Sequence, residues 1–498
     1  MPAIFNGFVY NRPADGKVLK ANVKEMKPET IIKLGTLLTA VLLVLCGAAF
    51  VAGLGVLFGN PAPQAAYRGV TVKEPAEPEN ITAAAVKTEL TAGSGKPSAV
   101  SGTWSNFRGD NFDAVSSETI PLVKAVSETS PALPELWSLP LGEGFAGFAV
   151  RNGCIYILDY DMQNKRDALR CLSLDDGGEI WRFSYPERIK KNHGMSRTIP
   201  AVTDKYCVAL SPLCRVMCVD AQSGKERWFI DLKQKYAATV PEWYAGQCPV
   251  IREHSAAIIA PAGPEALLVA LDCETGNEIW RTPNPFGWTM THSSIMPMTL
   301  DGRQTFVYFG KGGVVGVDAA DGKILWSTTD WQIEIATCPS PVILPGSRIF
   351  CCGGYLSGSL MLQISKNGEQ YEAKTLFRLK DAFFGSEQQT PLFYDGHLFG
   401  IRQRDKQFVC LDLSGSVVWT SGAKARFGSG PYIVADGMFL ILDDDGKLTA
   451  CEATSKAYRQ LFSAQVLDDH GCWAPMAIIQ GRLLLRDQVS MKCLDLRK

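Results

Sequence analysis

The stretch ALDCETGNEIW, residues 270–280, reads as a strand, a tight turn and a second strand. The side chain of Asp272 can accept hydrogen bonds from the turn amides, and Gly276 can adopt the positive φ that such a turn requires. The second strand delivers Trp280, whose burial against a neighbouring sheet would be worth roughly 2–3 kcal/mol. The stretch therefore predicts a hairpin that packs one sheet on the next.

The same pattern recurs along the chain. Its clearest copies are CLSLDDGGEIW (171–181), CVDAQSGKERW (218–228), GVDAADGKILW (316–326) and CLDLSGSVVW (410–419). Degenerate copies end at Phe377 and Phe462, PELWSLPL (134–141) supplies only a second half, and CLDLRK (493–498) only a first half. The successive large residues are 42 to 52 positions apart, a period typical of propeller blades. The predicted docking residues are Trp137, Trp181, Trp228, Trp280, Trp326 and Trp419.

A second set of stretches repeats in step with the first, and each would begin the innermost strand of one blade. The eight stretches are GFAGFAV (144–150), SRTIPAV (196–202), GQCPVI (246–251), HSSIMPM (292–298), CPSPVI (338–343), QQTPLFY (388–394), GSGPYIV (428–434) and CWAPMAI (472–478). Pairing 491–496 with 135–141 would close the ring and remove two sheet edges. We therefore predict an all-β, eight-bladed propeller of four-stranded antiparallel blades over residues 104–498; a seven-bladed ring or an open array is the alternative.

The N-terminal part of the chain is different in composition. Residues 34–58 contain no charged side chain, and as a helix they would extend about 37 Å, enough for a hydrocarbon core of ~30 Å. Basic residues are more frequent before this segment than after it, which by the positive-inside rule places the N-terminus in the cytoplasm. We expect a cytoplasmic arm (1–33), one transmembrane helix (34–58), a flexible linker (59–103) and a periplasmic propeller held at the inner membrane; a cleaved signal peptide is the alternative.

Composition and motifs restrict the function. The 50 basic and 51 acidic residues give a net charge of -1, which offers no electrostatic reason for a nucleic-acid partner. The five histidines lack metal-ligand spacing, and no nucleophile-elbow, zinc-protease or phosphate-loop motif occurs. The acidic run LDDDGKL (442–448) imitates a calcium loop, but its place between two strands favours a hairpin turn. The sequence therefore predicts no metal ligand and no catalytic residue.

The repeat A-x-D-x-x-T-G-x-x-x-W of residues 270–280 resembles the docking repeat of the pyrroloquinoline-quinone (PQQ) repeat propellers, which include quinoprotein alcohol dehydrogenases and BamB-like factors of outer-membrane assembly. WSNFRGDNFDAVS (104–116) is similar to the entry segment of such propellers, with Asp110 and Ala114 in place of the usual Pro and Gly. The resemblance covers roughly 104–498 and implies a fold more strongly than a function, because one fold hosts enzymes and scaffolds alike.

The resemblance to quinoprotein dehydrogenases implies an adjacent-cysteine disulfide beside the quinone, for which Cys351-Cys352 is the candidate. The pair lies in the strand-like stretch SRIFCCGGY, where both residues can also pack as small apolar side chains. It falls in the fifth blade, whereas the pair of the dehydrogenases falls in an early one. No calcium ligands or catalytic base can be assigned from the family pattern. The sequence therefore favours packing over a role in cofactor binding.

The residues just before the inner strands should surround the mouth of the central channel, where propellers commonly bind ligands. The predicted rim residues are Arg197, His292, Gln388, Gln389 and Trp473. We expect a non-enzymatic binding or scaffolding module without a cofactor, similar to BamB-like factors, with envelope proteins as partners. A membrane-bound dehydrogenase that uses PQQ and calcium is the alternative, and a sensor of envelope polysaccharide or lipid is left open.

Overall fold

The structure, a computed structural model, describes residues 86–127, 132–191, 194–252, 255–368 and 370–498.

Two units divide the chain, residues 1–84 and 85–498, and all the described residues belong to the second. The predicted arm (1–33) and membrane span (34–58) lie outside the described residues. In the part that is described, no helix is both long enough and apolar enough to cross a membrane.

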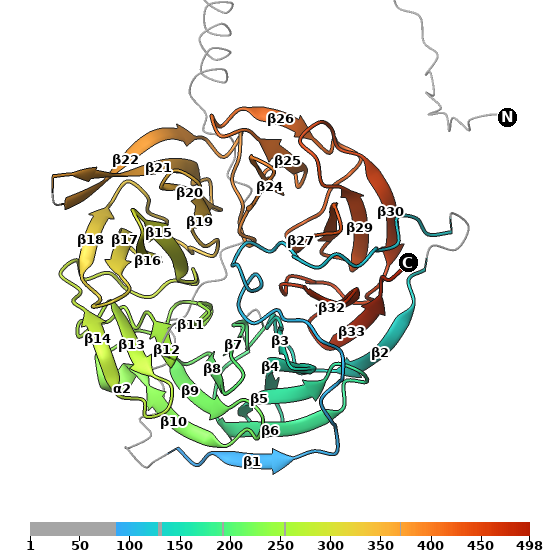
Figure 1. Ribbon diagram of the computed structural model, residues 1–498, viewed down its shortest axis with the longest axis horizontal. Helices are drawn as coiled ribbons and strands as arrows, with labels where there is room; N and C mark the ends of the chain where they lie inside the picture. Colours follow the sequence, from blue (N-terminus) through green and yellow to red (C-terminus); the bar gives the residue numbers. More distant parts are fainter. Residues whose placement is uncertain (1–85, 128–131, 192–193, 253–254, 369) are drawn as a thin grey trace, which may run out of the picture. The chain divides into compact units, whose positions relative to one another are not determined.

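The strands of the described residues form eight antiparallel sheets, which Figure 1 shows in sequence order around a common centre. The first four are β3 (Ala149–Arg151), β4 (Cys154–Asp161), β5 (Arg166–Ser173) and β6 (Glu179–Pro186); β7 (Ala201–Val202), β8 (Tyr206–Leu210), β9 (Arg215–Asp220) and β10 (Glu226–Asp231); β11 (Val250–Arg252), β12 (Ala256–Ile259), β13 (Leu268–Asp272) and β14 (Glu278–Thr282); and β15 (Met296–Leu300), β16 (Arg303–Gly310), β17 (Gly313–Asp318) and β18 (Ile324–Thr328).

The other four sheets complete the ring. They are β19 (Val342–Leu344), β20 (Arg348–Gly353), β21 (Gly358–Asn367) and β22 (Gln370–Leu379); β23 (Leu392–Tyr394), β24 (His397–Ile401), β25 (Phe408–Leu411) and β26 (Val417–Thr420); β27 (Tyr432–Ala435), β28 (Met438–Leu442), β29 (Lys447–Glu452) and β30 (Gln460–Gln465); and β31 (Ala477–Ile479), β32 (Arg482–Arg486), β33 (Ser490–Asp495) and β2 (Glu135–Pro140). The prediction of an eight-bladed propeller with four-stranded antiparallel blades is confirmed.

The last blade joins the two ends of the propeller. Strand β2 pairs antiparallel with β33, and Trp137 lies opposite Cys493 in that register. The predicted closure of the ring through 135–141 and 491–496 is therefore confirmed. Because this sheet takes strands from both ends of the domain, separating the blades there would break its hydrogen-bond ladder and expose two edges.

The repeated hairpins carry a tryptophan of one blade onto the turn of the next blade. The ring of Trp280 is buried, and its Nε1 donates to the carbonyl oxygen of Ala319 at 3.1 Å. Its Cε3 lies only 2.5 Å from where a Cβ on Gly322 would be, and Gly322 has a φ of +72°. The turn glycine is therefore needed twice, for its backbone conformation and for the space it leaves to the indole.

The other predicted docking tryptophans lie in matching places. Four are buried and the last is half-buried: Trp137, Trp181, Trp228, Trp326 and Trp419. In the fifth blade, where the motif is degenerate, Phe377 replaces the tryptophan and lies against Gly415 of the sixth blade. The packing role tolerates a different ring because burial of aromatic area, not one specific hydrogen bond, stabilises the contact.

An N-terminal strand precedes the first blade. Strand β1 (Glu89–Ala92) pairs antiparallel with β6 and adds a fifth strand to that sheet. Its residues belong to the range 59–103, for which the composition predicts a linker. All four side chains of β1 are exposed, so backbone hydrogen bonds to the open edge of the sheet hold the strand. Because the strand buries no side chain, it has no hydrophobic pattern by which the sequence could have predicted it. The one described helix, α2 (Leu232–Tyr236), follows β10 and is a single short turn capped by Asp231.

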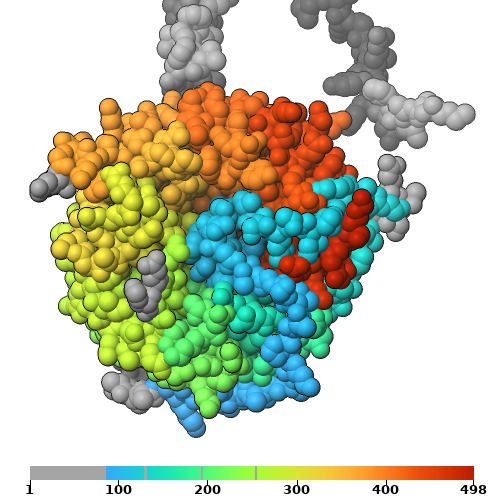
Figure 2. Space-filling view, viewed as in Figure 1, coloured from blue at the N-terminus to red at the C-terminus, as the bar shows by residue number. Residues whose placement is uncertain are grey.

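Residues 104–116 cross one end of the central channel, where Figures 1 and 2 show the blue N-terminal segment over the middle of the ring. Trp104 forms a β-bridge with Val150 in the first blade, and Val115 forms one with Val434 in the seventh. The segment thus connects the inner strands of two blades that are separated by the eighth blade. One end of the channel is covered by the chain itself.

Arg108 fixes this segment in the channel. Its Nη1 donates to the carbonyl oxygen of Thr390 at 2.7 Å, and its Nη2 donates to that of Pro391 at 2.9 Å. Burial lowers the pKa of Arg108 to about 10, so the guanidinium is still charged at neutral pH. A buried charge is stable here because backbone carbonyls replace the water it has lost.

Candidate functional site: the open mouth of the channel

The two ends of the channel are built from different loops. Strands alternate in direction, so the connections that precede the inner strands share one end with the loops between the second and third strands of each blade. The β-bridges of segment 104–116 are to inner strands, and Arg108 reaches a connection, the one before β23, whereas the predicted rim residues all lie in connections. We call the end formed by these connections the open mouth.

Trp473 lies at this mouth, half-buried, with its ring stacked on Phe145. The ring centroids are 5.1 Å apart and the planes differ by 21°. The Nε1 of Trp473 donates to Oδ1 of Asp444 at 2.7 Å. The indole is therefore held by a ring on one side and a carboxylate at its edge, and part of it stays exposed to solvent.

Arg197 belongs to the same group. The Cζ of its guanidinium lies 6.0 Å from the centroid of the Phe145 ring, within the range of a cation–π contact, and its Nη2 donates to the carbonyl oxygen of Gly194 at 2.9 Å. Burial lowers the pKa of Arg197 to about 10, which leaves the side chain cationic at neutral pH. The mouth therefore presents a positive charge beside an aromatic pair.

Gln389 connects three blades at this mouth. Its Nε2 donates to the carbonyl oxygens of Trp473, at 2.9 Å, and of Ser429, at 3.3 Å. Gln389 thereby positions the backbone that carries the indole. Gln388 is half-buried beside it.

His292 lies in the connection before β15, and its ring is 6.4 Å from that of Trp243. Burial, together with the charge of Arg197, lowers the pKa of His292 to about 4. The imidazole is therefore neutral at physiological pH. Within the described residues, its Nε2 is shielded from solvent and has no hydrogen-bond partner.

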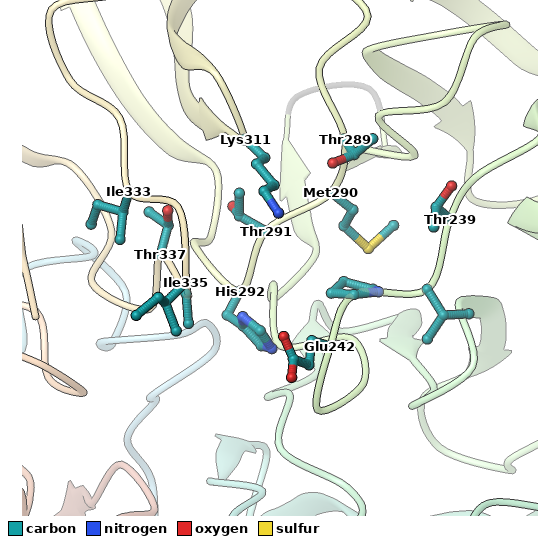
Figure 3. Close-up of a pocket in the computed structure, with 13 residues that line it drawn as sticks. Thr239, Glu242, Thr289, Met290, Thr291, His292, Lys311, Ile333, Ile335 and Thr337 are labelled. Carbon is teal, nitrogen blue, oxygen red and sulfur yellow. The ribbon is translucent and has the colours of Figure 1, made fainter. Parts of the chain in front are cut away.

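A pocket of about 160 Å³ lies next to His292, between the connections that precede β11, β15 and β19 (Figure 3). Lys311 and Glu242 bring opposite charges to its lining, and several threonine hydroxyls add polar groups. Met290, Ile333 and Ile335 form an apolar part of the wall. Of the predicted rim residues, Gln389 and Trp473 thus lie near Phe145 and His292 lies at this pocket, while the charge of Arg197 acts on both Phe145 and His292.

The sequence missed most of the side chains that complete these two places. Asp444 was visible only as part of the acidic turn 442–448, and Phe145 only as an apolar residue before an inner strand. Lys311 is in a two-residue loop whose glycine neighbours indicated a turn and nothing more. Glu242 lies within the long connection between α2 and β11, and the length of that connection is the one feature of the sequence that could have indicated a functional loop.

Cys351 and Cys352 do not share a surface. Successive residues of a strand point to opposite faces, and the two thiols are buried in different cores. Cys351 packs with Trp326 between the fourth and fifth blades, whereas Cys352 packs with Leu398 between the fifth and sixth. The cysteines of the described residues are all free thiols. The pair therefore does not form the surface beside a quinone that the resemblance implies.

The acidic run 442–448 is the β28–β29 turn. Oδ1 of Asp443 accepts hydrogen bonds from the amides of Asp445 at 3.0 Å and Lys447 at 2.9 Å. Among the described residues, no three histidine, cysteine or carboxylate side chains are grouped as a metal site would need. The acidic run is therefore a hairpin turn, as its place between two strands predicted.

Comparisons with known proteins agree with this architecture. The family model of the outer membrane protein assembly factor BamB matches residues 165–332 and again 249–368. The crystal structure of BamB from Moraxella catarrhalis is 13% identical, with a TM-score of 0.51 over 73% of this chain and 100% of that one. At this identity the likeness shows the fold alone.

Two further solved structures are similar at lower scores. The computationally designed Ika8 protein is 10% identical, with a TM-score of 0.48 over 72% of this chain and 99% of its own. A quinohemoprotein alcohol dehydrogenase from Pseudomonas putida HK5 is 13% identical, with a TM-score of 0.41 over 79% of this chain and 80% of its own. No curated protein matches the chain in sequence.

Proposed function

Since the chain is a β-propeller of the PQQ-repeat superfamily, we propose that it is a non-enzymatic binding or scaffolding module at the cell envelope, in the manner of BamB-like factors. The observation that carries the proposal is the difference between the two ends of the channel. One end is covered by residues 104–116, and the other presents the indole of Trp473, the charge of Arg197 and a pocket. A concave polar surface with an exposed aromatic residue is a common binding site of propellers and similar folds.

Large apolar side chains also surround the open mouth. Ile335, Leu356 and Phe383 are 53%, 79% and 55% exposed, and they lie in successive loops of the fourth to sixth blades. Scattered exposed apolar residues are ordinary, but three on adjacent loops of one end supply the kind of surface that a protein partner buries. We therefore assign the partner contact to this end of the propeller.

The proposed location follows from the sequence. Residues 34–58 would anchor the chain in the inner membrane, with the N-terminus in the cytoplasm and the propeller in the periplasm. The partner is then an envelope protein, and no cofactor is required for the interaction.

The test is photo-crosslinking in the full-length chain in its own membranes. A photoreactive residue at Leu356 or Phe383 should give a discrete adduct with an envelope protein. The matched control is the same residue at Asp321, an exposed position in a turn at the opposite end. Adducts of equal yield at Asp321, or none from either apolar position, would contradict the proposal.

The alternative function, a PQQ and calcium-dependent dehydrogenase, has a direct test of its own. When bound, PQQ would supply two-electron oxidation of a substrate. Purified full-length protein is titrated with PQQ and calcium, followed by absorbance and by dye reduction. Saturable binding with dye reduction would replace the scaffolding proposal with the enzymatic one.

A further inference from the structure

The pocket beside His292 has a rigid frame. The amide of Lys311 donates to the carbonyl oxygen of Thr289 at 3.0 Å. The buried ring of Trp288 lies behind the following loop, so closely that a Cβ on Gly312 would be 2.4 Å from its Cδ1. The backbone at Lys311 is therefore fixed, and its side chain extends into the pocket, as Figure 3 shows.

Two opposite charges face this pocket without neutralising each other. Neither the ammonium of Lys311 nor the carboxylate of Glu242 has an ion-pair partner among the described residues, although both are in the lining. Glu242 lies beside the ring of His292, while Lys311 enters from the other side (Figure 3). The empty space thus separates a cation from an anion, and it can hold a molecule that carries both complementary charges.

His292 does not disturb this arrangement. With its pKa lowered to about 4, it adds a neutral hydrogen-bonding ring next to Glu242 and no second positive charge. The carboxylate of Glu242 therefore stays available for a cationic group of a ligand. Hydrogen bonding to the backbone of Glu242 and Tyr244 raises the pKa of His292 again in part, and it holds the ring beside the pocket.

The rest of the wall is apolar. Met290 and Ile333 are buried, and Ile335 leaves about half of its surface exposed at the rim. Such a wall can bury an aliphatic group at roughly 25 cal/mol per Å² of apolar area. The pocket thus offers a cation, an anion and an apolar wall. A ligand that matches these three features is small, carries a carboxylate and an ammonium, and has an aliphatic side chain.

We propose that this pocket binds α-amino acids or very short peptides with an aliphatic side chain, the carboxylate at Lys311 and the ammonium at Glu242. The pocket volume of about 160 Å³ suits a single such molecule. This small-molecule site shares Ile335 and the same end of the propeller with the proposed partner contact, but it rests on Lys311 and Glu242 and does not depend on that contact.

The test is calorimetric titration of the full-length protein with leucine, N-acetyl-leucine, which lacks the ammonium, and leucinamide, which lacks the carboxylate. Leucine should bind saturably, and each analogue about fivefold to tenfold more weakly, because one charge contact is lost. Lys311→Met and Glu242→Gln should weaken leucine binding by the same factor. The control Lys424→Met, an exposed lysine in a connection at the same end, should change nothing.

Combining each variant with the analogue that lacks the complementary charge tests which side chain contacts which group of the ligand. Lys311→Met should not weaken leucinamide further, and Glu242→Gln should not weaken N-acetyl-leucine further, since each variant removes a contact that the analogue already lacks. The proposal is overturned if leucine does not bind at millimolar concentration, or if the two variants bind it as the wild type does. Crosslinking from Leu356 should persist in both variants, so that failure here leaves the scaffolding proposal standing.

Discussion

Trp473 and Phe145 stack across the junction between the last blade and the first, with 5.1 Å between their ring centroids. Phe145 precedes the inner strand of the first blade and Trp473 that of the last, so residues more than three hundred positions apart complete one aromatic pair. The pair is formed by the connections that precede β3 and β31, and the guanidinium of Arg197 lies 6.0 Å from the Phe145 ring. The contact therefore joins the first and last blades at the open mouth, in addition to the strand pairing that closes the ring.

Trp473→Ala should lower the free energy of unfolding by about 2 kcal/mol, because a half-buried ring leaves a gap beside Phe145. Trp473→Phe keeps a stacked ring and loses only the hydrogen bond to Asp444, which should cost about 1 kcal/mol. Thermal unfolding of the two variants side by side checks this order. Equal losses would show that the hydrogen bond, and not the stack, holds the junction.

Gly322→Ala should destabilise the propeller more than Gly302→Ala. Both glycines have a positive φ, +72° and +80°, so both substitutions strain the backbone by roughly 1–2 kcal/mol. A Cβ at Gly302 meets nothing within 4 Å, whereas one at Gly322 would collide with Trp280. The difference between the two midpoints of unfolding therefore measures the blade contact alone, and no difference would mean that the indole can shift without cost.

Asp167 should make the fold less stable as pH rises from about 4 to about 8. Burial, with the nearby charges of Glu187 and Asp159, raises its pKa to about 8, while hydroxyl groups of Tyr185 and Ser196 donate to its two oxygens. The native state then binds a proton that the unfolded chain releases above about pH 4, so stability is lost over this window.

Asp167→Asn removes this titration, and the decrease in melting temperature between pH 5 and pH 8 should become smaller. Asp176→Asn, in an exposed turn, is the matched control and should leave the decrease unchanged. An equally steep pH dependence in Asp167→Asn would assign the titration to another group.

Arg108→Met should release the segment that covers the channel. The substitution keeps most of the side-chain length and removes the donors to Thr390 and Pro391, whose carbonyls would be left unsatisfied at a cost of about 1–3 kcal/mol each. Residues 104–116 should then be cut by protease at conditions where the wild type is resistant. Arg404→Met, at an exposed arginine, should not change the cleavage.

Much of the architecture could be predicted because the hairpin is a local device. Asp272 accepts hydrogen bonds from the amides of Glu274 and Thr275, as the sequence suggested, and these contacts span only a few residues. No copy of this unit can bury its own aromatic ring. The rings of the eight copies become buried only when each blade packs against the next one. The number of blades and the closing pair of strands follow from that.

The candidate sites could be predicted only in part. The spacing placed Arg197, Gln389 and Trp473 near one mouth, but nothing in it indicated that Phe145 lies between two of them. The same spacing placed His292 at this mouth, but it did not indicate that His292 lines a pocket of its own, close enough to Arg197 to feel its charge. The connections before the inner strands differ in length, and each adopts a conformation set by the loops packed against it. Side chains at the same position of the repeat therefore lie at different points around the mouth.

The sequence by itself determined that this chain builds a ring of docked hairpins, because every copy of the motif carries its own turn and its own ring to bury. Only the tertiary structure decided which end of the ring is covered, how Arg108 holds the cover, and that Lys311 and Glu242 face the same space. These features join residues far apart in the chain, and their geometry is set by the packing of blades and loops, which no local pattern encodes.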